Sequence, residues 1–272
     1  MSWGRFDTRT IVLIPIAIAI NIVLGYAVQT VLKLPIYLDS IGTILVGVLA
    51  GPIPGLLTGI LSNLIWQYAP GIGGGTIGAF APVAGVIGLL AGVWGQLGVF
   101  RSRPASGSQL ALAALVAAAM VVAIIVPILN NPAYTDPNVG GYPEWVYTAA
   151  IVIAAAAALI VAAFIYVRRD LAGLWVAVAG VVTGIVAAIA SAPIAAYVFG
   201  GVTGSGVDLV VAALRQGGAD VLNASLGQGL FSDPIDKTIT SFVVFIVLTS
   251  LSPRFLARFP NGERLLGSGP AS

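Results

Sequence analysis

The 272-residue sequence contains no cysteine and no histidine, and only 8% of its residues are charged. Without cysteine the chain forms no disulfide and has no thiol chemistry. Without histidine it lacks the commonest metal ligand and the usual general base near neutral pH. Ordinary soluble domains carry about 25% charged residues. These absences argue against a soluble enzyme, and we expect no metal and no other cofactor.

Hydrophobic residues make up 58% of the chain, and the mean hydropathy is +1.03. The apolar residues form long runs rather than the short alternating segments of a membrane barrel, and a bilayer interior leaves no water to satisfy an open backbone. The composition therefore predicts an all-α, polytopic helical membrane protein. We expect residues 1–272 to form a single integral membrane domain.

Apolar segments of membrane-span length, roughly 17 to 25 residues, set the expected number of helices. The first run is too long for the apolar core of a signal peptide, so we expect it to remain as a membrane helix. The second and third segments are short and are joined by "GPIPG", whose prolines and glycines favour a tight hairpin. The eight predicted spans are 10–32, 36–51, 54–69, 78–99, 108–129, 145–167, 172–198 and 234–252.

The positions of Lys and Arg predict the orientation, because cytoplasmic loops are enriched in these residues. Eight spans with the N-terminus inside put nine of the twelve basic residues in the cytoplasm. We therefore expect a multi-pass protein of the bacterial cytoplasmic membrane, surrounded by lipid, with both termini cytoplasmic. The nine residues are Arg5, Arg9, Arg101, Arg103, Arg168, Arg169, Arg254, Arg258 and Arg264, and the three outside are Lys33, Arg215 and Lys237.

Ionisable residues at the edges of spans are candidates for function, because a charge at bilayer depth is costly unless it is paired or hydrated. Asp39 lies near the outer start of the second predicted span. Asp233 and Pro234 resemble a helix start, which would place Asp236 and Lys237 in the first turn of the last span. Asp39 is interpreted as a helix cap or as the wall of an outward-facing pocket, and as a partner for Lys237.

Uncharged polar residues predict where such a pocket would lie. Thr43 follows Asp39 by one helical turn, and Asn63, Trp66 and Gln67 share a face of the third span. The hairpin would bring the two faces together near the outer surface. The side-chain amides of Asn63 and Gln67 either line the pocket or form hydrogen bonds between helices.

Three segments are predicted on the outer side. The glycine-rich residues 69–82 form a gate or a plain loop, because no GK[ST] motif supports a phosphate site. Residues 130–145 include Asn131 and Trp145 and serve as an interface anchor or a substrate mouth. Residues 200–233 form an amphipathic segment with two short helices.

Glycine pairs at four-residue spacing predict close helix contacts, either within the protein or with a second membrane subunit. These pairs are Gly47 and Gly51, Gly55 and Gly59, and Gly88 and Gly92.

No set of residues suggests catalysis. Serine and threonine have no histidine partner, the acids are scattered, and no basic aromatic tract suggests nucleic acid binding. The cytoplasmic loops are too short for a nucleotide-binding domain, so we expect a protein that is not an enzyme.

The stretch "LPIYLDSIGTILVGVLAGPIPGLLTGILSNLIW" resembles the substrate-binding S components of energy-coupling factor (ECF) transporters. The resemblance covers residues 10–100. It implies a high-affinity membrane subunit for uptake of a vitamin-like micronutrient, working with a transmembrane T component and two cytoplasmic ATPases. S components usually have six spans, so six is the alternative to eight.

Two other functions remain open. A stand-alone secondary transporter would have interrupted helices and a site near the midplane. A membrane sensor or assembly module would bind a ligand or partner without moving it. For a transported or sensed molecule, the aromatic residues and Asp39 favour a nitrogenous heterocycle. The candidate binding residues are Asp39, Thr43, Asn63, Trp66, Gln67, Asn131, Trp145, Asp236 and Lys237.

Overall fold

The computed structural model describes residues 6–32, 34, 36–72, 77–129 and 144–266. Within these ranges the regular structure is helical, apart from one isolated bridge between Pro104 and Asp170. The all-α prediction is confirmed. The helices are α1 (Thr8–Gly25), α2 (Ile41–Ala50), α3 (Pro52–Gln67), α4 (Ala81–Gln96), α5 (Gly107–Leu129), α8 (Glu144–Arg168), α9 (Ala172–Pro193), α10 (Asp208–Gln216), α11 (Val221–Ser250), α12 (Pro253–Leu256) and α13 (Gly262–Leu266).

Among the described residues, three helical stretches are long and apolar enough to cross a membrane. They are Thr8–Val31, Ile77–Gln96 and Ala172–Val198. Shorter apolar helices accompany them, including α2 and the first part of α5. Large apolar side chains on α1, such as Val12 and Val23, are more than half exposed, which suits contact with lipid rather than water. The protein is a helical membrane protein.

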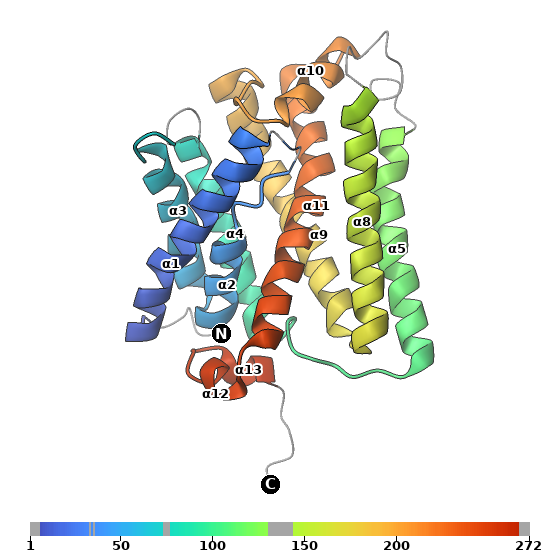
Figure 1. Ribbon diagram of the computed structural model, residues 1–272. Helices are drawn as coiled ribbons and strands as arrows, with labels where there is room; N and C mark the ends of the chain where they lie inside the picture. The colour runs from blue at the N-terminus through green and yellow to red at the C-terminus, as the bar shows by residue number, and fades with distance from the viewer. Residues whose placement is uncertain (1–5, 33, 35, 73–76, 130–143, 267–272) are drawn as a thin grey trace.

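Figure 1 shows the arrangement of the helices. The start of α1 lies at the same end as α12 and α13, and α10 lies at the opposite end. The α5 and α8 helices pair at one side of the molecule, while α9 packs closely along α11. Two helices end in π-helical turns, Tyr26–Val31 after α1 and Ile194–Val198 after α9.

The second predicted span is shorter than expected. The helix begins at Ile41, and residues 36–40 before it are not helical. Asp39 therefore lies outside the helix, and the N-cap position belongs to Ser40, whose side chain makes no capping bond. The expectation that Asp39 lies within the second span, near its outer start, is therefore wrong for the helix itself, which begins at Ile41.

The predicted start of the last span at residue 234 is also wrong. The α11 helix begins at Val221, where the Asp220 side chain accepts hydrogen bonds from the backbone N–H groups of Leu222 and Asn223 at 2.9 and 3.0 Å. It continues through Pro234, which membrane helices tolerate where neighbouring helices pack against the interruption. Asp236 and Lys237 consequently lie in the interior of α11 and not in its first turn.

The polar segment 200–233 divides differently from the prediction. Its first expected helix is present as α10, which begins at Asp208. Its second expected helix is the first part of α11, so residues 221–233 belong to the helix that carries Asp236.

Glycines at four-residue spacing bring α3 and α4 into backbone contact. A Cβ atom built on Gly55 would lie 2.3 Å from the backbone oxygen of Gly88, and one on Gly88 would lie 2.1 Å from that of Gly55. Similar contacts hold Gly47 against Gly88 and Gly92 against Pro52. The internal-packing interpretation of these glycines is confirmed.

A further glycine pair joins α9 to α11. A Cβ atom on Gly180 would lie 2.5 Å from the Cα atom of Thr238, and one on Gly184 would lie 2.4 Å from the Cα atom of Pro234. The backbones of the two helices therefore touch on both sides of the segment that carries Asp236 and Lys237.

We predict that Gly184→Ala destabilises the protein by about 1–3 kcal/mol, because the added methyl group meets backbone that has no flexible end to move aside. The free energy of unfolding in detergent measures the effect. Gly107→Ala is the matched control, since a Cβ atom there meets nothing within 4 Å. Equal stability of both variants would show that the α9–α11 contact is not tight.

Candidate functional site

The side chain of Asp236 holds the non-helical segment before α2 in place. Its Oδ1 atom accepts hydrogen bonds from the backbone N–H groups of Tyr37 at 3.0 Å and Leu38 at 2.7 Å. Leu38 has a φ of +50°, a left-handed conformation that costs roughly 1–2 kcal/mol for a residue with a Cβ atom. The carboxylate of α11 therefore stabilises a strained turn nearly two hundred residues away in the sequence.

Lys237 neutralises this carboxylate and extends the contact to Asp39. Its Nζ atom donates to Oδ2 of Asp236 and, at 2.9 Å, to Oγ of Ser40, and it lies 3.6 Å from Oδ1 of Asp39. The same atom lies 5.7 Å from the centre of the Tyr37 ring. The pair of Asp39 and Lys237 expected from the sequence is confirmed. The three N–H donors of the ammonium thus face three oxygen partners.

Asp39 is also bound from the opposite side. Nε2 of Gln29, in the π-helical turn after α1, donates to Oδ2 of Asp39 at 3.0 Å. Gln29 also donates to the backbone oxygen of Tyr37 at 3.3 Å. The end of α1, the start of α2 and the middle of α11 are therefore tied together by one polar cluster, which consists of Gln29, Asp39, Ser40, Asp236 and Lys237.

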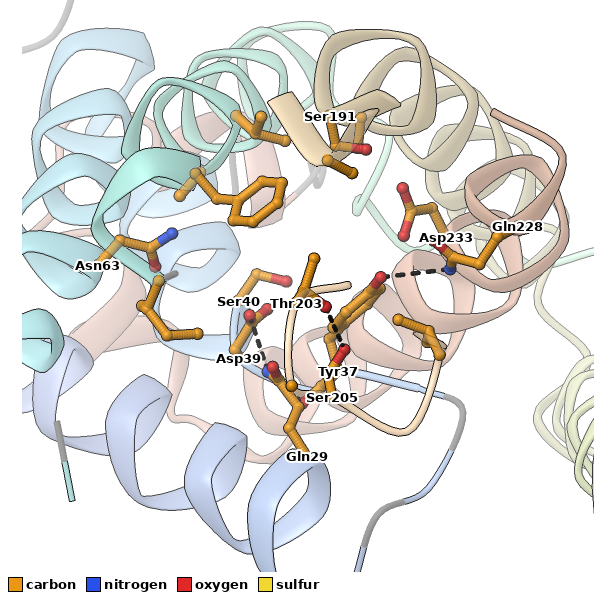
Figure 2. A pocket seen from close by; sticks show the side chains of 18 of the residues that line it. Gln29, Tyr37, Asp39, Ser40, Asn63, Ser191, Thr203, Ser205, Gln228 and Asp233 are labelled. Atoms are coloured by element: carbon orange, nitrogen blue, oxygen red, sulfur yellow. Dashed lines mark hydrogen bonds between the residues drawn. The ribbon is translucent and has the colours of Figure 1, made fainter. Parts of the chain in front are cut away.

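A cavity of about 300 Å³ lies beside this polar cluster (Figure 2). One wall is polar and comes from the polar cluster and α11, and the other is mostly apolar and comes from α4 and α9. A compact cavity with an apolar wall and a few convergent polar groups is the usual form of a small-molecule site. The residues that line the cavity include Tyr37, Asp39, Asn63, Trp66, Phe80, Ala187, Ser191, Ser225, Asp233 and Lys237.

Besides the hydroxyl of Ser225, two polar side chains of the cavity wall have no hydrogen-bond partner within the part of the chain that the structure describes. Asp233 is 5% exposed and Asn63 is 7% exposed, yet neither side chain has a hydrogen bond or ion pair with a described residue. Figure 2 shows them on opposite sides of the cavity. A buried, unpaired polar group is costly, so these two groups are available to a bound molecule.

A glycine-containing loop crosses one side of the cavity. Asp208 accepts hydrogen bonds from the backbone N–H groups of Thr203 at 2.9 Å and Gly204 at 2.6 Å, and from Oγ1 of Thr203 at 2.6 Å. Gly201 and Gly204 have φ angles of +85° and +84°, which favour glycine. The first turn of α10 thus fixes the loop that covers the cavity.

The structure brings five of the predicted residues to the site. Asp39, Asn63, Trp66 and Lys237 line the cavity, and Asp236 lies directly behind its wall. Trp66 is held by a 3.0 Å hydrogen bond from its indole N–H to the backbone oxygen of Ile72.

Two predicted residues lie away from the cavity. Thr43 packs inside the bundle, where its hydroxyl accepts a 2.8 Å hydrogen bond from Asn21. It does not share a face with Asp39, because Asp39 precedes the helix. Gln67 accepts a 2.8 Å bond from the backbone of Gly78 and so links α3 to the segment before α4. Both act as internal hydrogen-bonding residues and not as cavity lining.

The last two predicted residues are not located at the site. Asn131 lies outside the described residues, and the side chain of Trp145 is likewise not described, although its backbone belongs to α8. The glycine-rich residues 69–82 contribute Ile72, Ile77 and Phe80 to the lining, within their described part.

Several site residues were missed by the sequence analysis, above all Asp233. On α11, Ser225, Gln228, Ser232 and Asp236 recur every three or four residues, which is the spacing of one helical face. Assigning a helix start at Pro234 divided this polar stripe and hid it. Gln29 and Tyr37 carry no comparable signal, because their positions depend on the path of the segment before α2.

Comparison with known proteins gives no match: no family model, no curated protein and no solved structure is significantly similar to this chain. The function of the chain is therefore inferred from the chemistry of the site.

We predict that Lys237→Met destabilises the protein by about 3–5 kcal/mol, because it leaves the buried Asp236 carboxylate without its counter-charge. Unfolding in detergent measures the loss. Arg215→Met, which removes an exposed cation from α10, is the control and should change stability little. A double-mutant cycle with Asp236→Asn should give a coupling energy well above zero; additive effects would contradict the proposed pairing.

Proposed function

We propose that the chain is a membrane-embedded binding subunit for uptake of a small, vitamin-like solute. The observation that carries the proposal is the cavity with buried polar groups, Asp233 and Asn63 among them, that have no hydrogen-bond partner in the described residues. A structural core would satisfy these groups internally, whereas a binding site leaves them for the solute.

We infer that the chain crosses the membrane eight times, with both termini in the cytoplasm. The eight apolar segments correspond to α1, α2, α3, α4, α5, α8, α9 and α11. The start of α1 and the helices α12 and α13 lie at one end, and most arginines are expected there. The cavity lies toward α10, at the other end, so it would receive its solute from outside.

The resemblance of residues 10–100 to ECF S components suggests how uptake would be driven. The cavity borders on this region through Asp39, Asn63 and Trp66. In this proposal a T component and two cytoplasmic ATPases supply the energy, and the chain itself supplies the binding site.

A stand-alone secondary transporter is the second candidate, and the interrupted helices favour it. The α2 helix has only ten residues and follows a non-helical segment, α1 and α9 end in π-helical turns, and α11 contains Pro234. Transporters of this kind use interrupted helices and buried charges at the substrate site.

We predict that the wild-type protein purified in mild detergent retains a small molecule that native mass spectrometry detects. Ser191→Phe should lower its occupancy at least tenfold, because Ser191 faces the cavity and a phenyl ring would fill much of the space. Ser250→Phe, on the exposed end of α11, is the control. Equal occupancy in both variants would place the solute elsewhere.

We predict that the tagged chain, purified from membranes of its own host, brings down a T component and two ATPases. Uptake of the retained solute into liposomes should then require all four chains and ATP. Gradient-driven uptake by this chain alone would instead establish the secondary-transporter candidate.

A further inference from the structure

The carboxylates of the cavity differ in how well they are satisfied. Asp208 binds the loop at Thr203 and Gly204, and Asp236 accepts two backbone hydrogen bonds and the Lys237 ammonium. Asp39 receives a hydrogen bond from Gln29 and lies 3.6 Å from the same ammonium. Asp233 alone among these four has no partner among the described residues, although it is 95% removed from solvent.

Lys237 forms ion pairs with Asp39 and Asp236 and makes no hydrogen bond to Asp233. Its three N–H groups face Asp236, Ser40 and Asp39, so its donors are already engaged. The described lining includes three aspartates and this one lysine, and Asp236 adds a further carboxylate behind the wall. Four aspartates therefore lie in or behind the cavity wall with one lysine, and Asp233 is the one without a hydrogen-bond partner among the described residues.

We propose that the molecule bound in this cavity is a small organic cation whose positively charged nitrogen pairs with Asp233. This inference rests on the proposed binding function and specifies its substrate class: a protonated amine or a protonated nitrogen heterocycle. The incoming cation supplies the counter-charge and the N–H donors that the buried carboxylate lacks.

The other lining residues and the volume of the cavity indicate the size, shape and polar groups of the rest of this molecule. Opposite Asp233, the Asn63 amide offers both a donor and an acceptor, and the hydroxyl of Ser225 has no partner within the described residues. Tyr37, Trp66 and Phe80 provide aromatic surface around an otherwise aliphatic wall. The volume of about 300 Å³ is at the small end of the roughly 300–1,000 Å³ range of ligand pockets. A flat molecule of one or two rings with a single cationic group fits this combination.

A neutral Asp233 that donates a hydrogen bond to an uncharged solute is the competing explanation. The two explanations differ in their response to Asp233→Asn. Asparagine keeps a hydrogen-bond donor and the side-chain shape but removes the negative charge, so it should preserve binding of an uncharged acceptor and weaken binding of a cation.

The test uses the full chain purified in detergent, with thermal unfolding followed by differential scanning calorimetry. The probes are three amine and alcohol pairs of matched shape: benzylamine and benzyl alcohol, 2-phenylethylamine and 2-phenylethanol, and tryptamine and tryptophol. We expect at least one amine to raise the unfolding temperature of the wild-type protein in a saturable way, with its alcohol partner giving a much smaller shift. Hydrogen bonds to charged groups are stronger than those between neutral groups. Asp233→Asn should therefore weaken the apparent affinity for the amine about 10- to 100-fold.

The control variant is Asp220→Asn, which removes an exposed carboxylate from the start of the same helix and retains a good N-cap residue. Its amine affinity should equal that of the wild type. Without any probe, Asp233→Asn should unfold at the same temperature as the wild type or higher, because Asp233 makes no hydrogen bond or ion pair with a described residue that the substitution would break. This result would separate a loss of binding from a loss of folding.

Three results would overturn the proposal: no stabilisation by any amine, equal stabilisation by an amine and its alcohol, or unchanged amine affinity in Asp233→Asn. Identifying the molecule that the purified protein retains shows whether only the cation proposal is wrong or whether the proposed binding function is wrong as well. If the retained solute is neutral or anionic, the proposed binding function is supported and the proposal of a cationic solute is wrong. If the protein retains no solute and supports no uptake, the proposed binding function itself is wrong.

Discussion

The buried ion pair of Asp236 and Lys237 is the interaction on which the site depends. Burying two charges costs free energy unless their hydrogen-bonding groups are satisfied, and here both side chains are fully used. Asp236 binds the backbone of Tyr37 and Leu38, and Lys237 binds Ser40 and approaches Asp39. One pair on α11 thus determines the conformation of the segment before α2. The cavity wall forms as a consequence of this pairing.

The hydrogen bonds of the Asp236–Lys237 pair also explain why Asp233 is left without a hydrogen-bond partner among the described residues. Lys237 and Asp233 are one helical turn apart on α11, but the ammonium is directed to the segment before α2 and its partners lie there. One carboxylate of α11 therefore holds the segment before α2, and the proposed binding role belongs to another carboxylate of the same helix. Asp236 holds the fold together, and Asp233 remains open to the cavity.

The sequence predicts the helical class and most helix positions because these depend on apolar run length. It also pairs Asp39 with Lys237, since charges at bilayer depth require partners. It misassigns Asp233 because an Asp–Pro step is compatible both with a helix start and with an interrupted helix, and only the packing of Gly184 against Pro234 distinguishes them. Thr43 is misplaced for a similar reason: the one-turn rule assumes a helix, and residues 36–40 are not helical.

The backbone contact between α9 and α11 has a consequence for how this protein could change its preference for solutes. Gly180 and Gly184 set the separation of the two helices without using any cavity side chain. Substitutions at Ala187, Ser191 or Asn63 can therefore reshape the pocket while the frame around it stays the same. Such a division between frame and lining allows new ligand specificities to evolve by single substitutions, with little loss of stability.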